Sequence, residues 1–157
     1  MESLPYKSEL ITVSEEMCDH NGHMNVNFYY KLFDKCYTDM YVEDLDFSSE
    51  YLKSGFSTFT LEDNYRYIKE CLLGEKLVPR YRLHNVNKKL LHVVAVLENE
   101  SRDICAFYET ILGHIDMNSR KTSEMQEDFL SNLIALMQES SNIKIEMDLR
   151  LKIKDLA

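Results

Sequence analysis

The sequence of 157 residues lacks tryptophan and contains only four glycines and two prolines. Without a Ser/Gly-rich or Pro-rich stretch, no segment qualifies as a flexible linker, so we expect one continuous domain. No run approaches the roughly 18 to 20 apolar residues that a membrane-spanning helix needs. Residues 1–10 have neither a basic lead nor an apolar signal core, so we expect a cytoplasmic protein without a membrane partner.

Basic residues are also outnumbered by acidic ones. The chain has 18 Lys and Arg residues against 27 Asp and Glu, a net charge of -9, which opposes binding to nucleic acid. Its four cysteines include no Cys-x-x-Cys pair, and they do not combine with the five histidines into the spacing of a zinc site. We therefore expect reduced thiols, no nucleic-acid partner, no metal and no cofactor.

A change of hydrophobic period divides the chain into a helical and a strand-rich part. From Val26 to Tyr41, apolar residues recur every three or four positions, which predicts a helix buried along one side. Asn25 is the natural N-cap of this helix. A second helix is predicted from Ser123, ending at residues 140–142. Stretches rich in Thr, Tyr, Val, Ile and Phe predict strands at residues 6–13, 57–72, 76–86, 89–98 and 103–117.

One early helix and several long antiparallel strands make an α+β domain, in which the sheet must wrap the single apolar helix. This arrangement is the hot-dog fold. Residues 1–142 are expected to form that domain. The remaining residues, 143–157, alternate strictly between apolar and charged side chains, which predicts a strand that belongs to the same domain and covers an edge or a face of a sheet.

The densest cluster of functional groups is the segment from Asp19 to Asn25, just before the first helix. The N–H groups near Gly22, His23 and Met24, at a helix start, are suited to polarise a carbonyl and hold an oxyanion. A neighbouring carboxylate, Asp19, is suited to attack that carbonyl or to activate a water molecule.

The same segment resembles the start of hot-dog acyl-CoA thioesterases of the 4-hydroxybenzoyl-CoA thioesterase type. Further along, the pattern is similar to the betainyl-CoA thioesterase branch of carnitine and betaine degradation, and the similarity extends over about residues 6–138. The matching positions are Asp19-x-Asn21-Gly22-His23-Met24-Asn25, Tyr29-Tyr30, Phe33-Asp34, Phe59-Thr60-Leu61-Glu62, Tyr67, Glu70, Gly74, Lys89-x-x-His92, Glu109 and His114-x-Asp116.

The resemblance implies hydrolysis of a small acyl-CoA thioester, with CoA as part of the substrate. Asp19 would be the catalytic carboxylate and Glu62 a second candidate on a facing strand, while His23 and Asn25 would shape the site and the turn at Gly22 with the helix start would hold the oxyanion. The family also implies a homodimer or a tetramer, in which the helix start of one subunit faces the sheet of the other.

Two ligand subsites follow from the same comparison. Because the chain lacks tryptophan, tyrosines would line the acyl pocket, namely Tyr29, Tyr30, Tyr65 and Tyr67. The CoA phosphates need cationic or N–H donors, which the polar turn with Ser119, Arg120 and Lys121 would supply ahead of a helix N-terminus; Lys88 and Lys89 are the other candidates.

Other interpretations of these residues stay open. Asp19 and Asn21 are also common turn and capping residues, and Glu62 would simply pair with Arg66 or Arg82. A hot-dog hydratase or dehydratase, with His23 as its base, and a non-catalytic acyl-CoA-binding protein are the alternative functions. The sequence does not reveal the acyl group, the role of Asp19 as nucleophile or base, or the number of subunits.

Overall fold

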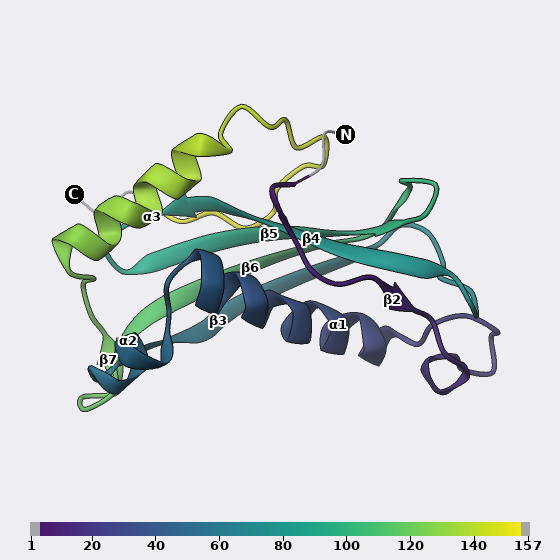
Figure 1. The fold of residues 1–157 in the computed structure, drawn as a ribbon, viewed down its shortest axis with the longest axis horizontal. Coiled ribbons are helices and arrows are strands. Elements are labelled where there is room, and N and C mark those ends of the chain that lie inside the picture. Colours follow the sequence, from purple (N-terminus) through teal and green to yellow (C-terminus); the bar gives the residue numbers. More distant parts are fainter. Residues whose placement is uncertain (1–3, 155–157) are drawn as a thin grey trace.

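The computed structural model describes residues 4–154, which form a seven-stranded antiparallel sheet and several helices (Figure 1). The strand order is β1-β4-β5-β6-β3, while β2 also pairs with β4 and β7 with β6. No helix within this part of the chain is long and apolar enough to cross a membrane. The strands are β1 Tyr6–Lys7, β2 Ile11–Thr12, β3 Phe56–Tyr67, β4 Lys76–Val86, β5 Leu90–Asn99, β6 Ile104–Asp116 and β7 Lys121–Thr122.

The long helix α1, Val26–Asp39, packs its apolar side against one face of this sheet. Its buried Phe33 stacks on Tyr108 of β6, with ring centroids 5.2 Å apart. Tyr81 of β4 donates its hydroxyl to the Phe33 carbonyl oxygen at 3.0 Å. The helix continues as one π-helical turn, η2 Met40–Asp44. The predicted α+β fold, with a sheet around one apolar helix, is therefore confirmed.

The N-terminal strand is shorter than its sequence pattern predicts. Instead of one strand over 6–13, β1 and β2 are separated by residues 8–10. The interruption lies opposite Pro79 of β4, whose carbonyl oxygen still accepts from the N–H of Ser8 at 3.0 Å. A proline has no N–H to donate to a ladder, so the pairing cannot continue through it.

The second helix begins later than predicted. α3 spans Glu127–Glu139, whereas Ser123 lies in extended backbone after β7. The N–H of Ser123 donates to the His114 carbonyl oxygen at 2.9 Å, and that of Met125 donates to Lys88 at 2.8 Å. These long-range bonds hold residues 123–125 against the sheet, so the helix starts only after them. α3 packs into the same apolar core as α1, through Leu133 and Phe129.

Residues 143–154, here called the strap, lie on the opposite face of the sheet. The apolar side chains of the strap are buried or half-buried and its charged ones are exposed, but none of its described residues is in a strand. Ile145 and Leu149 pack with Val94, Val96 and Phe107, which point away from α1. The predicted strand is thus wrong, because the strap lies on the face of the sheet instead of pairing with an edge. Residues 155–157 lie outside the described part.

Buried polar side chains hold the backbone of the strap in place of a strand ladder. The carboxylate of Glu109 on β6, which is 0% exposed, accepts from the N–H groups of Arg150 at 3.0 Å and Leu151 at 3.1 Å. The guanidinium of Arg82 on β4 donates to the carbonyl oxygens of Ser140 at 3.1 Å and Ile143 at 2.6 Å. The outer sheet face therefore combines an apolar surface with polar anchors for the strap.

Two histidines beneath the strap should make stability depend on pH. Burial is the main cause that lowers the pKa of His92 from 6.5 to about 4, and the charge of Arg82 adds to it. Burial also lowers the pKa of His84 from 6.5 to about 4, with further contributions from His92 and Arg82. Between these values the unfolded chain binds more protons than the folded one, so the free energy of unfolding falls as the pH drops from about 6.5 to about 4. We expect a loss of roughly 1 to 3 kcal/mol for each histidine, measured by urea denaturation across this window.

The matched variants separate this effect from general acid denaturation. His92→Gln should flatten the slope, whereas His20→Gln, at an exposed histidine, should leave it unchanged. His114, whose pKa burial also lowers, accounts for part of the slope that remains. An identical slope in wild type and His92→Gln would contradict the assignment.

Candidate functional site

The segment before α1 forms a closed loop. The N–H of Asp19 donates to the His23 carbonyl oxygen at 3.1 Å, and that of Gly22 donates back to Asp19 at 2.9 Å. Gly22 has a φ of 82°, which a glycine adopts without strain. The loop thereby places Asp19 and the first residues of α1 next to each other.

The Asp19 carboxylate is held from two directions. One oxygen accepts from the N–H of Asn21 at 2.8 Å, and the other accepts from the Asn25 side-chain amide at 2.9 Å. The hydrogen bond from Asn25 is the largest cause that lowers the pKa of Asp19, and the one from Asn21 is the second. The carboxylate is therefore ionised at neutral pH. The side-chain oxygen Oδ1 of Asn25 accepts from the N–H of Asn27 at 3.1 Å. One side chain thus caps α1, as predicted, and fixes Asp19.

A cleft of about 250 Å³ opens beside this loop, between the start of α1 and the segment after β3. Asp19 does not line the cleft and lies next to lining residues, because His23 and Asn25 connect it to the start of the helix. The lining residues are His23, Met24, Val26, Tyr29, Tyr67, Ile68, Lys69 and Glu70.

The structure changes which N–H groups are available for an oxyanion. The N–H of Gly22 is used by Asp19, and the N–H of Met24 donates to the Cys71 carbonyl oxygen at 2.8 Å. Among residues 4–154, by contrast, the N–H groups of His23 and Val26 have no acceptor in the chain. Of the predicted N–H groups, His23 remains available, and Val26 at the first helical position joins it.

The four predicted pocket tyrosines divide into two pairs. Tyr29 and Tyr67 line the cleft together, with ring centroids 5.0 Å apart in an edge-to-face arrangement. Tyr67 is 51% exposed, whereas Tyr29 is 3% exposed. Tyr30 and Tyr65 lie outside the cleft lining, with their ring centroids 6.1 Å apart. The structure therefore brings only the first pair to the cleft.

The charged side chains that line the cleft leave a net negative charge there. Lys69 donates to Asp103 at 2.5 Å, so its ammonium is neutralised by a partner. Glu70 also lines the cleft, and among the described residues its carboxylate has no ion pair. Sequence reasoning did not assign Glu70 or Val26 to the site, although Glu70 is one of the positions that match the family pattern.

The structure does not bring Glu62 to Asp19. A bulge between Thr60 and Glu62 shifts the alternation of β3, so that Glu62 lies opposite Ile111 on the face that carries the strap. Asp63 takes the side of α1 instead and accepts from the hydroxyl of Tyr108 at 2.9 Å. The sequence pattern alone predicts a regular alternation along β3, which would place Glu62 on the side of α1. The bulge adds one residue, and this extra residue reverses the face of every later side chain.

The predicted phosphate turn lies at the far end of the sheet from Asp19. Ser119 and Arg120 precede β7 rather than a helix N-terminus, because α3 begins only at Glu127. The Arg120 guanidinium lies over the ring of Phe59 at 4.9 Å from its centroid. Within one chain, this turn and the cleft are therefore separate.

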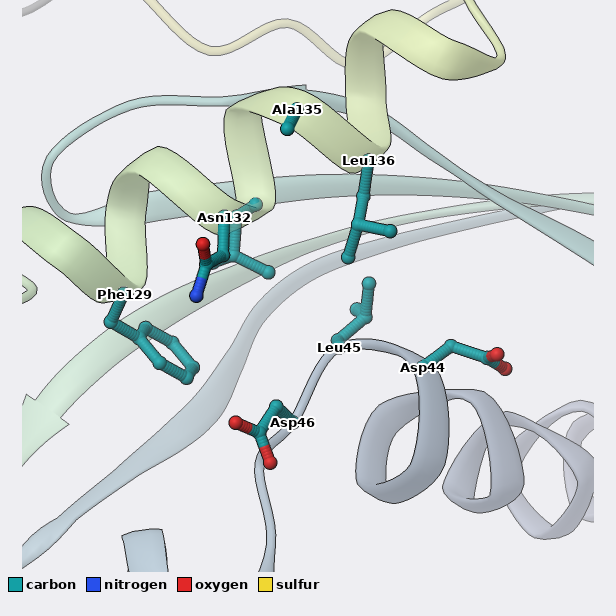
Figure 2. Close-up of a pocket in the computed structure, with 8 residues that line it drawn as sticks. Asp44, Leu45, Asp46, Phe129, Asn132, Ala135 and Leu136 are labelled. Carbon is teal, nitrogen blue, oxygen red and sulfur yellow. The ribbon is translucent and has the colours of Figure 1, made fainter.

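A second pocket, of about 330 Å³, lies between α3 and the loop that follows η2 (Figure 2). Phe129 and Leu136 face Leu45 across it, with Asp44 and Asp46 on the loop side (Figure 2). It contains none of the predicted site residues. The part of the chain that the structure describes also has no group of three or more His, Cys, Asp or Glu side chains that could hold a metal ion.

A sheet that wraps an apolar helix, with an ionised carboxylate and two available N–H groups at the helix start, defines a hot-dog domain with a candidate acyl site. The family comparison agrees with this class. The model of the Thioesterase-like superfamily matches residues 13–133. The chain belongs to the Thioesterase-like superfamily.

Individual relatives point the same way. The chain is 28% identical over 122 residues to an "L-carnitine dehydrogenase/betainyl-CoA thioesterase" of Rhizobium meliloti, covering 77% of this chain and 24% of that protein. It is 27% identical over 138 residues to a "Betainyl-CoA thioesterase" of Pseudomonas aeruginosa, covering 83% and 86%. The chain thus spans about a quarter of the first relative and most of the second.

The fold is also that of a solved protein. A hypothetical protein of Staphylococcus aureus, solved in complex with CoA, superposes with a TM-score of 0.83 at 22% identity. The match covers 98% of this chain and 97% of the other. At this identity the likeness establishes the fold, including its C-terminal region.

The double role of Asn25 can be tested directly. Asn25→Ala removes the cap of α1, which should lower the free energy of unfolding by about 1 kcal/mol in urea denaturation. The same change removes an amide donor from Asp19, so the pKa of Asp19 should rise toward its ordinary value in an NMR titration. Asn27→Ala, which keeps the cap, is the control, and an unchanged Asp19 pKa in Asn25→Ala would refute the coupling.

Proposed function

We propose that the protein hydrolyses small acyl-CoA thioesters to a free acid and CoA. The observation that carries this proposal is the ionised Asp19 carboxylate, fixed by Asn25 at the start of α1 beside a cleft. Membership of the Thioesterase-like superfamily supports it, as do the relatives named as betainyl-CoA thioesterases. As expected from the sequence, CoA would enter as part of the substrate.

The start of α1 would stabilise the charge that develops on the thioester oxygen. His23 and Val26 both line the cleft, their N–H groups have no acceptor in the described chain, and the helix dipole adds partial positive charge at that point. These donors strengthen their bonds as the carbonyl oxygen becomes an oxyanion, which lowers the barrier to attack.

Asp19 would act as the general base. A water oxygen bonds to the carbonyl carbon while its proton passes to Asp19, and the C–S bond then breaks as the CoA sulfur leaves and takes up that proton. Because Asp19 does not itself line the cleft, the geometry favours a water molecule between it and the carbonyl. Direct attack by Asp19, through a mixed anhydride, is the alternative route.

The cleft also suits an acyl group that carries a positive charge. Tyr67 and Tyr29 offer aromatic surface, and Glu70 supplies a negative charge without an ion-pair partner among residues 4–154. A quaternary ammonium is stabilised by both features. A betainyl group, with its trimethylammonium, is therefore the acyl group that we favour.

A complete site would require two subunits. β3 is an edge strand, and antiparallel pairing of β3 with its copy would place the beginning of one strand at the end of the other. The turn with Arg120 and Lys121 lies beside the beginning of β3, because Phe56 pairs with Asp116. In such a homodimer, this turn of one subunit would lie near the cleft of its partner and could hold the CoA phosphates.

Thiol release from an acyl-CoA panel tests the reaction. Asp19→Asn should lower kcat by at least about 100-fold, because it removes the base. Betainyl-CoA should be cleaved with a kcat/KM about tenfold above that of tert-butylacetyl-CoA, its neutral isostere, and Glu70→Gln should reduce this preference.

Asp128→Asn, at an exposed position of α3, is the matched control and should retain full activity. Undiminished hydrolysis by Asp19→Asn would overturn the assigned base. An equal rate with both isosteres would reject the cationic acyl group while leaving the hydrolase intact.

Mixed subunits test the shared site. Asp19→Asn and the double variant Arg120→Glu, Lys121→Glu should each be inactive alone, because each breaks both sites of a homodimer. Co-expressed in equal amounts, half of the dimers contain one site with both parts intact, so activity should recover to about a quarter of wild type. Light scattering confirms the dimer, and no recovery in mixed dimers would show that each chain forms its site alone.

A further inference from the structure

Arg82 carries a buried positive charge that has no counter-ion among the described residues. It lies in the middle of β4 under the strap and is 5% exposed. Its guanidinium donates to two carbonyl oxygens and to Nδ1 of His84, and no carboxylate within residues 4–154 pairs with it. Buried charges in folded proteins are almost always paired, so this arrangement is incomplete without an anion nearby.

The neighbouring acid does not fill this role. Glu109 is 0% exposed, and its oxygens already accept from the N–H groups of Arg150 and Leu151. It also pairs with Arg66 at 3.5 Å. The cluster under the strap thus holds two guanidinium groups and one carboxylate, an excess of one positive charge in a chain whose net charge is -9.

Two imidazole rings, those of His84 and His92, lie close to the Arg82 guanidinium. Because Nδ1 of His84 accepts from Arg82, a neutral His84 carries its proton on Nε2 and is a hydrogen-bond donor there. The ring of His92 lies edge-to-face with it at 5.0 Å. His92 is 2% exposed, and its Nε2 lies 3.5 Å from the Glu109 carboxylate without a hydrogen bond among the described residues. Nε2 of His84 has no partner among the described residues, so this ring offers a polar atom that residues 4–154 do not satisfy.

A cavity of about 260 Å³ lies against these rings. The sheet contributes His84, Asn85 and His92 to its polar side, and the strap contributes an apolar wall that includes one lysine. At about 30 Å³ for each water molecule, the cavity has room for about eight waters, or for a small organic ion. The strap residues in its wall are Leu149, Leu151, Lys152 and Ile153.

We propose that this cavity is a binding site for a small aliphatic carboxylate, bridging the sheet and the strap. The carboxylate oxygens accept from Nε2–H of His84 and from the Lys152 ammonium, and the hydrocarbon part packs on Leu149 and Ile153. Arg82 donates to Nδ1 of His84 and polarises the imidazole, and the bound carboxylate is the negative charge that Arg82 lacks. The site lies on the opposite sheet face from the Asp19 cleft and does not depend on the proposed hydrolase function.

Titration of the full chain with sodium butyrate tests the proposal. The NMR signals of the His84 and His92 rings should shift saturably, and the melting temperature should rise with butyrate concentration. Butyramide, the neutral analogue of the same shape, should produce neither effect. Sodium chloride at equal ionic strength is the third probe, and an equal response to chloride or butyramide overturns the assignment of a carboxylate site.

Two variants locate the binding. His84→Gln and Lys152→Gln should each weaken butyrate binding at least tenfold, whereas Lys154→Gln, at an exposed strap lysine outside the cavity wall, should bind as wild type does. Lys152 is exposed, so its variant remains informative even if His84→Gln does not fold. Unchanged butyrate affinity in Lys152→Gln overturns the proposed bridge between sheet and strap.

Discussion

Burial of α1 against one face of the sheet is the constraint on which the other features depend. Phe33, Tyr81 and Tyr108 interlock at the centre of this contact, and large aromatic side chains contribute most of the apolar area that stabilises such a core. Because the packing fixes the position of the helix, it also fixes where the helix begins. Asp19, Asn25 and the cleft are therefore positioned by core residues that take no part in chemistry.

The same helix start serves both the stability of the fold and the proposed site. The side-chain oxygen of Asn25 accepts from the N–H of Asn27, and its amide nitrogen donates to Asp19. The loop that contains these residues is bound to the Cys71 carbonyl oxygen through the N–H of Met24. Such support from neighbouring groups keeps a carboxylate in one orientation. Within residues 4–154, the N–H groups of His23 and Val26 remain available after these bonds are made, and they are the donors of the proposed oxyanion site.

The helix, the four long strands and the fold class could be predicted because their periodicities extend over many residues. Where the prediction failed, a single local feature outweighed the pattern. Pro79 interrupts the first strand, the bulge after Thr60 turns Glu62 to the other face, and long-range bonds delay α3 past Ser123. The resemblance proposed Asp19 and four tyrosines for the site, and of these tyrosines the structure places only Tyr29 and Tyr67 in the cleft lining.

The strap has the burial pattern of a strand without the hydrogen bonds of one, because side chains of the sheet receive its backbone groups. It occupies the apolar surface formed by Val94, Val96 and Phe107. A second sheet could stack on that surface only after displacing it. Any assembly of this chain must therefore use other surfaces, because residues 143–154 already cover this face of the sheet as a built-in second layer.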